Sequence, residues 1–291
     1  MGLLADFKAL FKSKKVDVRT RYEFLREAVS GTMSKFYMAR DRETERIVGV
    51  KILDPKKTAE FEARFKGAKK PSEGEITAAI DHPRIVKLFE HGLTTADEQF
   101  LVLEFLEGQG LNSVVVAKSS LLEGRHLDLL RQAAQSLEAV HKAGYIHRDV
   151  CPRNFILSPD GDSLKLIDFG LAVPATPQFM QPGNRTGNPN YMAPEIIKRQ
   201  STDHKVDVFA FGIMAYEILT FELPWSKGLT GKAAMDHATK PPMDITRFRP
   251  KIHPKLADAV GECLTQEPAR RCPSLAHFLR QIHGLKKVDQ E

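Results

Sequence analysis

The hydrophobic pattern changes once along this chain, near residue 105, and this change restricts the fold more than any other feature. Before it, apolar residues form the short runs that are typical of buried strands, at Val48–Leu53, Ile85–Phe89 and Phe100–Phe105. A helical stretch over 59–80 interrupts these runs and is itself broken around Gly67 and Pro71. We predict that this part of the chain is a small β-rich lobe.

From Leu111 onward, apolar residues recur at the helical period, and strongly apolar helices are expected over 206–219 and 256–263. Chain that is rich in Pro and Gly, over 168–194, precedes both of these helices. The two patterns together predict an α+β chain of two lobes, of which the second is larger and helical. Clefts between lobes are a usual position for ligand sites.

Composition excludes several classes of protein. Hydrophobic residues make up 42% and charged residues 27% of the 291 residues, as in ordinary globular proteins. The net charge of +6 is too small to predict nucleic-acid binding, and three scattered cysteines predict neither a disulfide framework nor a zinc site. No apolar run approaches the roughly 18 residues of a transmembrane span, and we expect a cytoplasmic protein.

Two acids in distinctive surroundings indicate the chemistry. Asp149 is followed five residues later by Asn154, in the run I-H-R-D-V-C-P-R-N at 146–154. Asp168 follows an apolar strand and precedes Phe-Gly. Mg²⁺ prefers oxygen ligands and keeps water and substrate phosphates in the rest of its shell. Asp168 and Asn154 are therefore candidate metal ligands, and Asp149 is free to accept a proton from a hydroxyl group.

A lysine at the end of a β-branched run is a candidate phosphate-binding cation. The run V-G-V-K at 48–51 ends in Lys51, whose ammonium group would act as a point charge beside phosphate oxygens. Such a lysine needs an acidic partner to hold it, and Glu73 lies on the helix that follows.

These motifs, taken together, resemble those of the eukaryotic-type protein kinase family. The shared set is a strand lysine, a helix glutamate, H-R-D with a downstream Asn, D-F-G, and A-P-E at 193–195, in this order. The resemblance covers about 22–283 and includes Asp207 and Arg271, the arginine that in this family pairs with the A-P-E glutamate. It implies a bilobal kinase fold with an N-lobe over about 22–105 and a C-lobe over about 108–283, preceded by an extension (1–21) and followed by a short tail (284–291).

The resemblance also assigns roles to single residues. Lys51 is expected to hold the α- and β-phosphates of ATP and to pair with Glu73, which is preferred to Glu75 as its partner. Asp168 and Asn154 are expected to bind Mg²⁺, and Asp149 to accept the proton of the substrate hydroxyl. Around the adenine, the resemblance implies Leu103 as gatekeeper, bonds to the backbones of Glu104 and Leu106, and Ile156 below the base. The remaining residues expected around ATP belong to the phosphate-covering loop and to the strands above the adenine, and they are Val29, Gly31, Phe36 and Gly49.

The phosphate-covering loop departs from the family pattern. It reads V-S-G-T-M-S-K-F over 29–36, so that only Gly31 remains of the usual glycines, with Val29 and Ser34 in place of the others. Such a loop should be stiffer or lie further from ATP. Phe36 replaces the usual Val and Gly49 the usual Ala, and we expect the larger and the smaller residue to compensate each other in volume.

The catalytic loop departs from the pattern as well. Cys151 stands where Ser/Thr kinases usually carry a Lys, and we expect Arg153 to supply the missing cation. Asn188 replaces the Thr that bridges this Lys and the catalytic acid. Pro152 nevertheless favours the Ser/Thr class, because tyrosine kinases usually have Ala at this position.

The sequence therefore predicts an ATP-dependent kinase that phosphorylates a protein hydroxyl, most simply Ser or Thr. A tyrosine or dual-specificity kinase, and a pseudokinase that acts as a scaffold, remain as alternatives. A small-molecule kinase is disfavoured by the A-P-E set. Thr176 and Thr186 are candidate regulatory phosphorylation sites, a separate regulatory partner is a further candidate, and an amphipathic helix is expected over 3–11.

Overall fold

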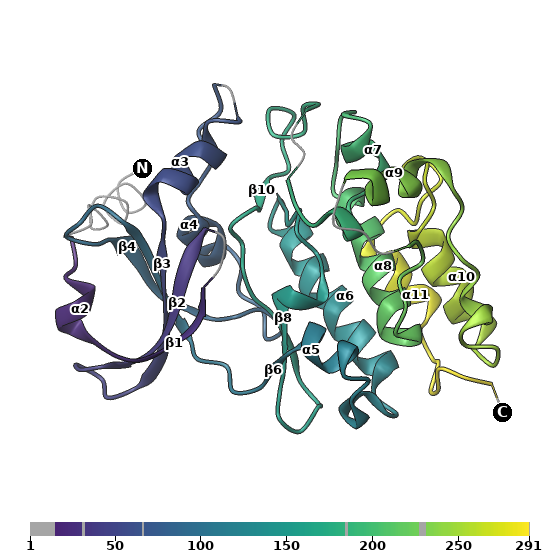
Figure 1. Ribbon diagram of the computed structural model, residues 1–291, viewed down its shortest axis with the longest axis horizontal. Coiled ribbons are helices and arrows are strands. Elements are labelled where there is room, and N and C mark those ends of the chain that lie inside the picture. The colour runs from purple at the N-terminus through teal and green to yellow at the C-terminus, as the bar shows by residue number, and fades with distance from the viewer. Residues whose placement is uncertain (1–14, 31–32, 66, 184–185, 227–230, 291) are drawn as a thin grey trace, which may run out of the picture. The chain divides into compact units, whose positions relative to one another are not determined.

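The computed structural model describes residues 15–30, 33–65, 67–183, 186–226 and 231–290, which fall into two compact units. Unit 1 comprises Met1–Ala78 and Val86–Leu106, and unit 2 comprises Ala79–Ile85 and Glu107–Glu291. The expected α+β class is confirmed, because unit 1 is built around a sheet and unit 2 is mainly helical (Figure 1). The amphipathic pattern over 3–11 lies outside the described residues.

Unit 1 contains a five-stranded antiparallel sheet in the order β1-β2-β3-β5-β4 (Figure 1). Its strands are β1 (Tyr22–Ser30), β2 (Ser34–Asp41), β3 (Ile47–Leu53), β4 (Leu88–Leu93) and β5 (Gln99–Glu104). Its helices are α2 (Val18–Arg21), α3 (Pro55–Glu62) and α4 (Glu73–Ala78). Asp54 begins α3, since its carboxylate accepts a bond from the amide of Lys57 and proline occupies the first helical position.

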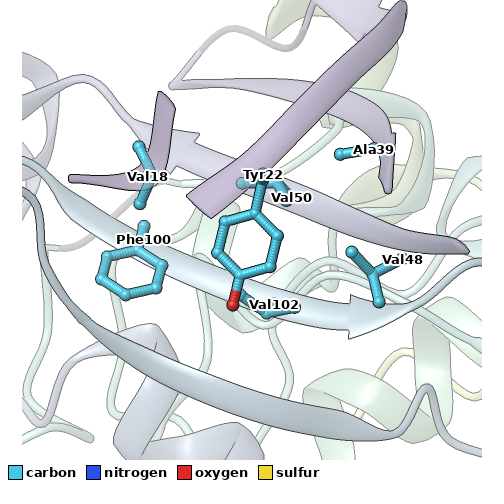
Figure 2. Packing of buried hydrophobic residues seen from close by; sticks show 7 residues of the cluster. All are labelled: Val18, Tyr22, Ala39, Val48, Val50, Phe100 and Val102. Atoms are coloured by element: carbon cyan, nitrogen blue, oxygen red, sulfur yellow. The ribbon is translucent and has the colours of Figure 1, made fainter. Parts of the chain in front are cut away.

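One face of this sheet carries the core of unit 1. The buried residues that form it are Val18, Tyr22, Ala39, Val48, Val50, Phe100 and Val102 (Figure 2). Successive side chains of a strand point to opposite faces. Because Val48 and Val50 belong to the core, Gly49 and Lys51 belong to the other face of β3, and the same alternation puts Leu103 on that other face of β5.

The fourth strand begins later than the apolar run predicts. Ile85 and Val86 are buried but precede β4, which starts at Leu88. The amide of Ile85 donates to the carbonyl of His82 in a turn, and Ile85 pairs with Leu166 in an isolated bridge within unit 2. The prediction of a strand over Ile85–Phe89 is therefore wrong at its start, because Ile85 belongs to unit 2 and pairs there with Leu166.

Unit 2 is organised around a central buried helix. Its helices are α5 (Leu111–Val116), α6 (His126–Lys142), α7 (Pro194–Ile197), α8 (Lys205–Thr220), α9 (Gly231–Thr239), α10 (Pro254–Cys263) and α11 (Leu275–Gln281). Every residue of α8 is buried except Lys205 and Glu217, which explains why its sequence is apolar on all sides. No helix of the described residues is long and apolar enough to cross a membrane.

Short strands and single turns hold the loops of unit 2 that matter for function. The strands are β6 (Gln109–Gly110), β7 (Tyr145–Ile146), β8 (Phe155–Leu157), β9 (Leu164–Leu166) and β10 (Val173–Pro174). The 3-10 turns are η1 (Ser120–Leu122), η2 (Pro152–Asn154), η3 (Pro189–Tyr191) and η4 (Ile245–Arg247). Pairing of β6 with β8, β8 with β9, and β7 with β10 fixes both ends of the segment 147–154.

Candidate active site

A buried ion pair joins β3 and α4 in unit 1. Lys51 Nζ lies 2.6 Å from Glu73 Oε1, and the two side chains are only 9% and 5% exposed. Glu75 is engaged elsewhere, since its Oε2 accepts a 2.7 Å bond from the amide of Ser72, whose hydroxyl in turn accepts a bond from the amide of Glu75. This reciprocal cap begins α4. The structure thus brings Lys51 together with Glu73 and not with Glu75.

Phe36 and Gly49 fit against each other beside this lysine. Phe36 is the cross-strand partner of Lys51 in the register of β2 and β3. A Cβ added to Gly49 would lie 2.3 Å from Cζ and 2.8 Å from Cε2 of Phe36, far inside any real carbon contact. The aromatic ring therefore fills the volume that an alanine methyl group would need, which supports the expected compensation between the two residues.

Replacing Gly49 by alanine is expected to destabilise unit 1 by about 2 kcal/mol while Phe36 is present, because it overpacks the sheet. Phe36→Val should make room for the methyl group, so the double variant Phe36→Val/Gly49→Ala should lose less stability than the two single variants combined. Urea denaturation of all four proteins measures this coupling. Gly261→Ala is the control, because nothing lies within 4 Å of a Cβ at that exposed helical position. Strictly additive losses would contradict the fit between ring and glycine.

The other cofactor-binding candidates of unit 1 lie on three segments. Val29 belongs to β1 and pairs with Phe36, whereas Gly31 lies outside the described residues. Leu103 is 6% exposed and pairs with Gly49 across β3 and β5. Leu103 and Gly49 are therefore neighbours on the sheet face that also carries Lys51.

Glu104 and Leu106 follow Leu103 at the end of unit 1. The amide of Glu104 donates to the carbonyl of Lys87 at 2.9 Å, and the Glu104 carboxylate accepts a 2.7 Å bond from the amide of Lys87. Because the Glu104 amide already donates to the Lys87 carbonyl, an adenine base would bond to the carbonyl of Glu104. Leu106 is half-buried and is the last residue of the unit.

In unit 2, the loop between β7 and β8 holds Asp149 and Asn154 together. The side-chain amide of Asn154 donates to Asp149 Oδ2 at 2.9 Å and to the Asp149 carbonyl at 2.6 Å. Both amide hydrogens of Asn154 are therefore used, which leaves its side-chain oxygen for a cation. The carboxylate of Asp149 is fixed in orientation by the same bond.

Asp168 lies beside this loop. The amide of Ile167 donates to the carbonyl of Asn154 at 2.8 Å, so the next residue, Asp168, is held near Asn154. Asp168 has a φ of +71°, an unusual backbone angle for a residue with a side chain, and its Oδ1 accepts a bond from Gly170. Ile156, the candidate for the surface below the adenine, is half-buried on β8.

The oxygen atoms of Asn154 and Asp168 suit Mg²⁺. Among the residues that the structure describes, no three His, Cys, Asp or Glu side chains gather in a way that could hold a metal ion. An ion at Asn154 and Asp168 would thus complete its shell with water and phosphate oxygens, which is how magnesium usually binds in phosphate-transfer sites.

Asp207, on α8, binds the backbone at the start of the segment 147–154. Its Oδ2 accepts bonds from the amide of His147 (2.7 Å) and lies 2.9 Å from His141 Nε2, and its Oδ1 accepts the amide of Arg148 (2.8 Å). Burial acts to raise the pKa of Asp207, but these bonds outweigh it, so the pKa lies below the usual value. The sequence pointed to Asp207 but not to His141, whose only signal is its place in the last turn of α6.

Cys151 and Arg153 interact directly. The Cys151 thiol is fully buried, and burial together with the charge of Asp149 raises its pKa to about 12. Its side chain therefore does not take the place of the exposed Lys that the family pattern leads one to expect here. Arg153 is exposed, donates to the Cys151 sulfur and lies close enough to Asp149 to interact with its charge.

The segment before Tyr191 packs closely on this loop. Gly187 has a φ of +118°, and a Cβ there would lie 2.9 Å from the carbonyl oxygen of Arg148 and 3.7 Å from Asp149 Oδ1. Asn188 caps η3, because its side-chain oxygen accepts a bond from the amide of Asn190. The side-chain oxygen of Asn188 is therefore used within its own turn.

The two candidate phosphorylation sites lie in different surroundings. Thr186 is half-buried and lines a small cavity together with Arg148 and Asp149, whereas Thr176 is exposed.

A second buried ion pair anchors α7. Arg271 donates to both carboxylate oxygens of Glu195, at 2.7 and 2.9 Å, and the two side chains are 0% and 3% exposed. The other bonds of the guanidinium go to the carbonyls of Lys205, Thr265 and Gln266. All five N–H donors of Arg271 are therefore satisfied.

Sequence reasoning missed one buried cation near the first ion pair. Lys70 is 8% exposed, its ammonium donates to the carbonyl of Pro71 at 3.2 Å, and it lies 5.6 Å from the ring centre of Phe61. Burial lowers its pKa. A basic run such as 64–70 usually indicates a solvated loop, and only the position of Lys70 just before α4 hinted otherwise.

Comparison with known proteins agrees with this geometry. A family model described as "Protein kinase domain" matches residues 22–282. The serine/threonine-protein kinase pkn2 of Myxococcus xanthus is 32% identical over 269 residues, which cover 89% of this chain and 31% of that protein. The serine/threonine-protein kinase PknA of Mycobacterium tuberculosis is 31% identical over 279 residues, which cover 93% of this chain and 62% of that protein.

The chain thus spans between about a third and three-fifths of the length of these relatives. The match over 22–282 includes both buried ion pairs, the Asp149–Asn154 loop and Asp168. By sequence and by structure, this chain belongs to the protein kinase domain family.

Proposed function

We propose that this chain transfers the γ-phosphate of ATP to Ser or Thr hydroxyl groups of a protein. The observation that carries the proposal is the bond from Asn154 to the Asp149 carboxylate, with Asp168 held next to Asn154. A fixed carboxylate next to two metal-binding oxygens is what phosphoryl transfer to a hydroxyl requires, because that reaction depends on positioning and charge stabilisation. The names of the relatives favour the Ser/Thr class.

In this proposal, each of the site residues has one task. Asp149 orients the hydroxyl of the protein substrate and accepts its proton. Lys51, held by Glu73, binds the α- and β-phosphates. Asn154 and Asp168 hold Mg²⁺, which would supply positive charge to the phosphates when bound. The adenine is bound by Leu103, Glu104, Leu106 and Ile156, under a roof made by Phe36 and Gly49, with Val29 and Gly31 in the segment over the phosphates.

Arg153 takes over the task of the lysine that is absent at position 151. It is exposed, and the bond to the Cys151 sulfur and the charge of Asp149 hold it at the loop. We expect Arg153→Ala to lower kcat/KM for the protein substrate about tenfold, the loss of roughly 1.4 kcal/mol of transition-state stabilisation. Arg153→Lys should recover part of the rate, since it keeps the charge. A full rate in Arg153→Ala would show that this arginine is a surface residue only.

Phosphoamino-acid analysis tests the proposal. The purified protein is incubated with radiolabelled ATP, Mg²⁺ and a generic protein substrate, beside Asp168→Asn and a control, Asp258→Asn, which changes an exposed acid on α10. We expect label on Ser or Thr from the native protein and from Asp258→Asn, and none from Asp168→Asn.

Two results would overturn the proposal. Label on Tyr would assign a different acceptor. No label from any of the proteins, with Mg-ATP in excess, would favour a scaffold that uses the kinase fold without turnover, and the substitutions in the loop over 29–36 would then be the first cause to examine.

A further inference from the structure

Two buried thiols of unit 2 lie at the two ends of the loop 264–271, which also carries Arg271. Cys263 is the last residue of α10, and Cys272 follows the loop 264–271. Both side chains are fully buried, at 0% and 1% exposure, and both cysteines are free. The Cys272 thiol donates to the carbonyl of Ser274 at 3.3 Å, and the two thiols are close enough for each to shift the pKa of the other.

The backbone shows independently that the two cysteines are close. The amide of Cys272 donates to the carbonyl of Glu262 at 3.2 Å, so the loop 264–271 returns to the residue just before Cys263. On its other side Cys263 is held by α8, where a Cβ on Gly212 would lie 2.7 Å from Cys263 Cβ. Cys263 is therefore packed closely against α8 at its Cβ.

The loop between the two cysteines has a structural task. It ends in Arg271, directly before Cys272, and the Arg271 guanidinium bonds to the Thr265 and Gln266 carbonyls within the same loop and to Glu195 on α7. A covalent bond between Cys263 and Cys272 would close the loop at its base and restrict Arg271 to the position in which it holds Glu195.

We propose that Cys263 and Cys272 are a modification site at which a peroxide forms a disulfide bond, and that this bond stabilises the Arg271 loop. The inference does not depend on the proposed kinase activity, because it concerns the thiols and the stability of unit 2.

The chemistry assigns different tasks to the two sulfurs. The interaction with Cys263 lowers the pKa of Cys272, and the same interaction raises the pKa of Cys263. Cys272, as thiolate, attacks the peroxide: its S–O bond forms, the O–O bond breaks, and Cys272 becomes a sulfenic acid. Cys263 then attacks that sulfur, the S–S bond forms, and the hydroxide leaves as water with the proton of the Cys263 thiol. In total, the two thiols lose two electrons and hydrogen peroxide is reduced to two molecules of water.

We expect peroxide to reach the buried thiols when the loop 264–271 opens locally. The loop between them reaches the surface, with Glu267, Ala269 and Arg270 exposed, and Pro273 on the other side of Cys272 is exposed as well. Surface loops open at lower free energy than the core. Cys151 provides an internal comparison, since its thiol is buried next to Arg153 and its pKa is raised to about 12.

The test is to oxidise the reduced full chain with hydrogen peroxide and to measure its intact mass, its disulfide-linked peptides and its thermal unfolding midpoint. We expect a loss of about 2 Da, one cross-linked peptide pair that contains Cys263 and Cys272, and a midpoint raised by roughly 5–10 °C over the reduced protein. Added dithiothreitol should reverse all three changes. Cys151→Ala should behave like the native protein, whereas Cys272→Ala and Cys272→Ser should show no loss of 2 Da.

Three outcomes contradict the inference. The absence of a mass loss at peroxide concentrations that fully oxidise free cysteine would show that the thiols are inert. A cross-link that involves Cys151 would show that another pair reacts. An unchanged or lower midpoint in the cross-linked protein would show that the bond does not stabilise the loop. The native protein alone decides all three, so the test does not rely on a variant that folds poorly.

Discussion

Arg271→Ala is expected to lower the free energy of unfolding by about 3–5 kcal/mol, because it leaves the Glu195 carboxylate buried without its partner. Glu195 is 3% exposed and receives two hydrogen bonds from Arg271. The substitution also removes the donors to three backbone carbonyls. Arg271→Lys should recover only part of the loss, since an ammonium group cannot make the paired bonds of the guanidinium plane.

The measurement is equilibrium urea denaturation, with the neighbouring residue as the matched control. Arg270 is exposed, and Arg270→Ala should change stability by less than about 0.5 kcal/mol. Removing both partners, in Arg271→Ala/Glu195→Ala, should cost less than the sum of the single changes because neither charge is then left alone. If Arg271→Ala and Arg270→Ala had the same free energy of unfolding, the ion pair of Arg271 with Glu195 would not contribute to stability.

The stability of unit 2 is expected to fall by about 3 kcal/mol between pH 6.5 and pH 4, owing to one histidine. His126 is 7% exposed at the start of α6, and burial together with the charge of Arg249 lowers its pKa from 6.5 to about 4, against an opposing effect of Asp289. Between pH 6.5 and pH 4, His126 is therefore protonated in the unfolded chain but largely neutral in the folded chain. Stability is fully present above pH 6.5 and is lost progressively as the pH falls toward 4, at about 1.4 kcal/mol for each unit of pKa shift.

A variant that cannot titrate isolates this contribution. His126→Phe keeps an aromatic ring next to Phe221, with which His126 is in edge contact, and should flatten the dependence of unfolding free energy on pH in this range. His283→Gln changes an exposed histidine and should leave the slope as in the native protein. Urea denaturation at several pH values compares the three proteins. An unaltered slope in His126→Phe would assign the acid sensitivity to other groups.

Local sequence was sufficient for most of the elements and motifs. The alternation of Val48 and Val50 with Gly49 and Lys51 defines the two faces of β3, and the continuous apolar residues of α8 predict a buried helix. The start of β4 could not be predicted, because Ile85 is buried by contact with Leu166, which is far away in the chain. Hydrophobicity reports that a residue is buried but not which partner buries it.

What the sequence by itself determined is the family and the residues that we propose for the chemistry, because motifs such as H-R-D, D-F-G and A-P-E are recognised from the order of neighbouring residues. Only the tertiary structure decided how side chains distant in sequence use one another. In the folded chain, Lys51 pairs with Glu73 and not with Glu75. The Phe36 ring fills the space left by Gly49. The thiols of Cys263 and Cys272 lie close enough to shift each other's pKa. Each of these results depends on distances and free volume between segments, and such quantities arise only when the chain is packed.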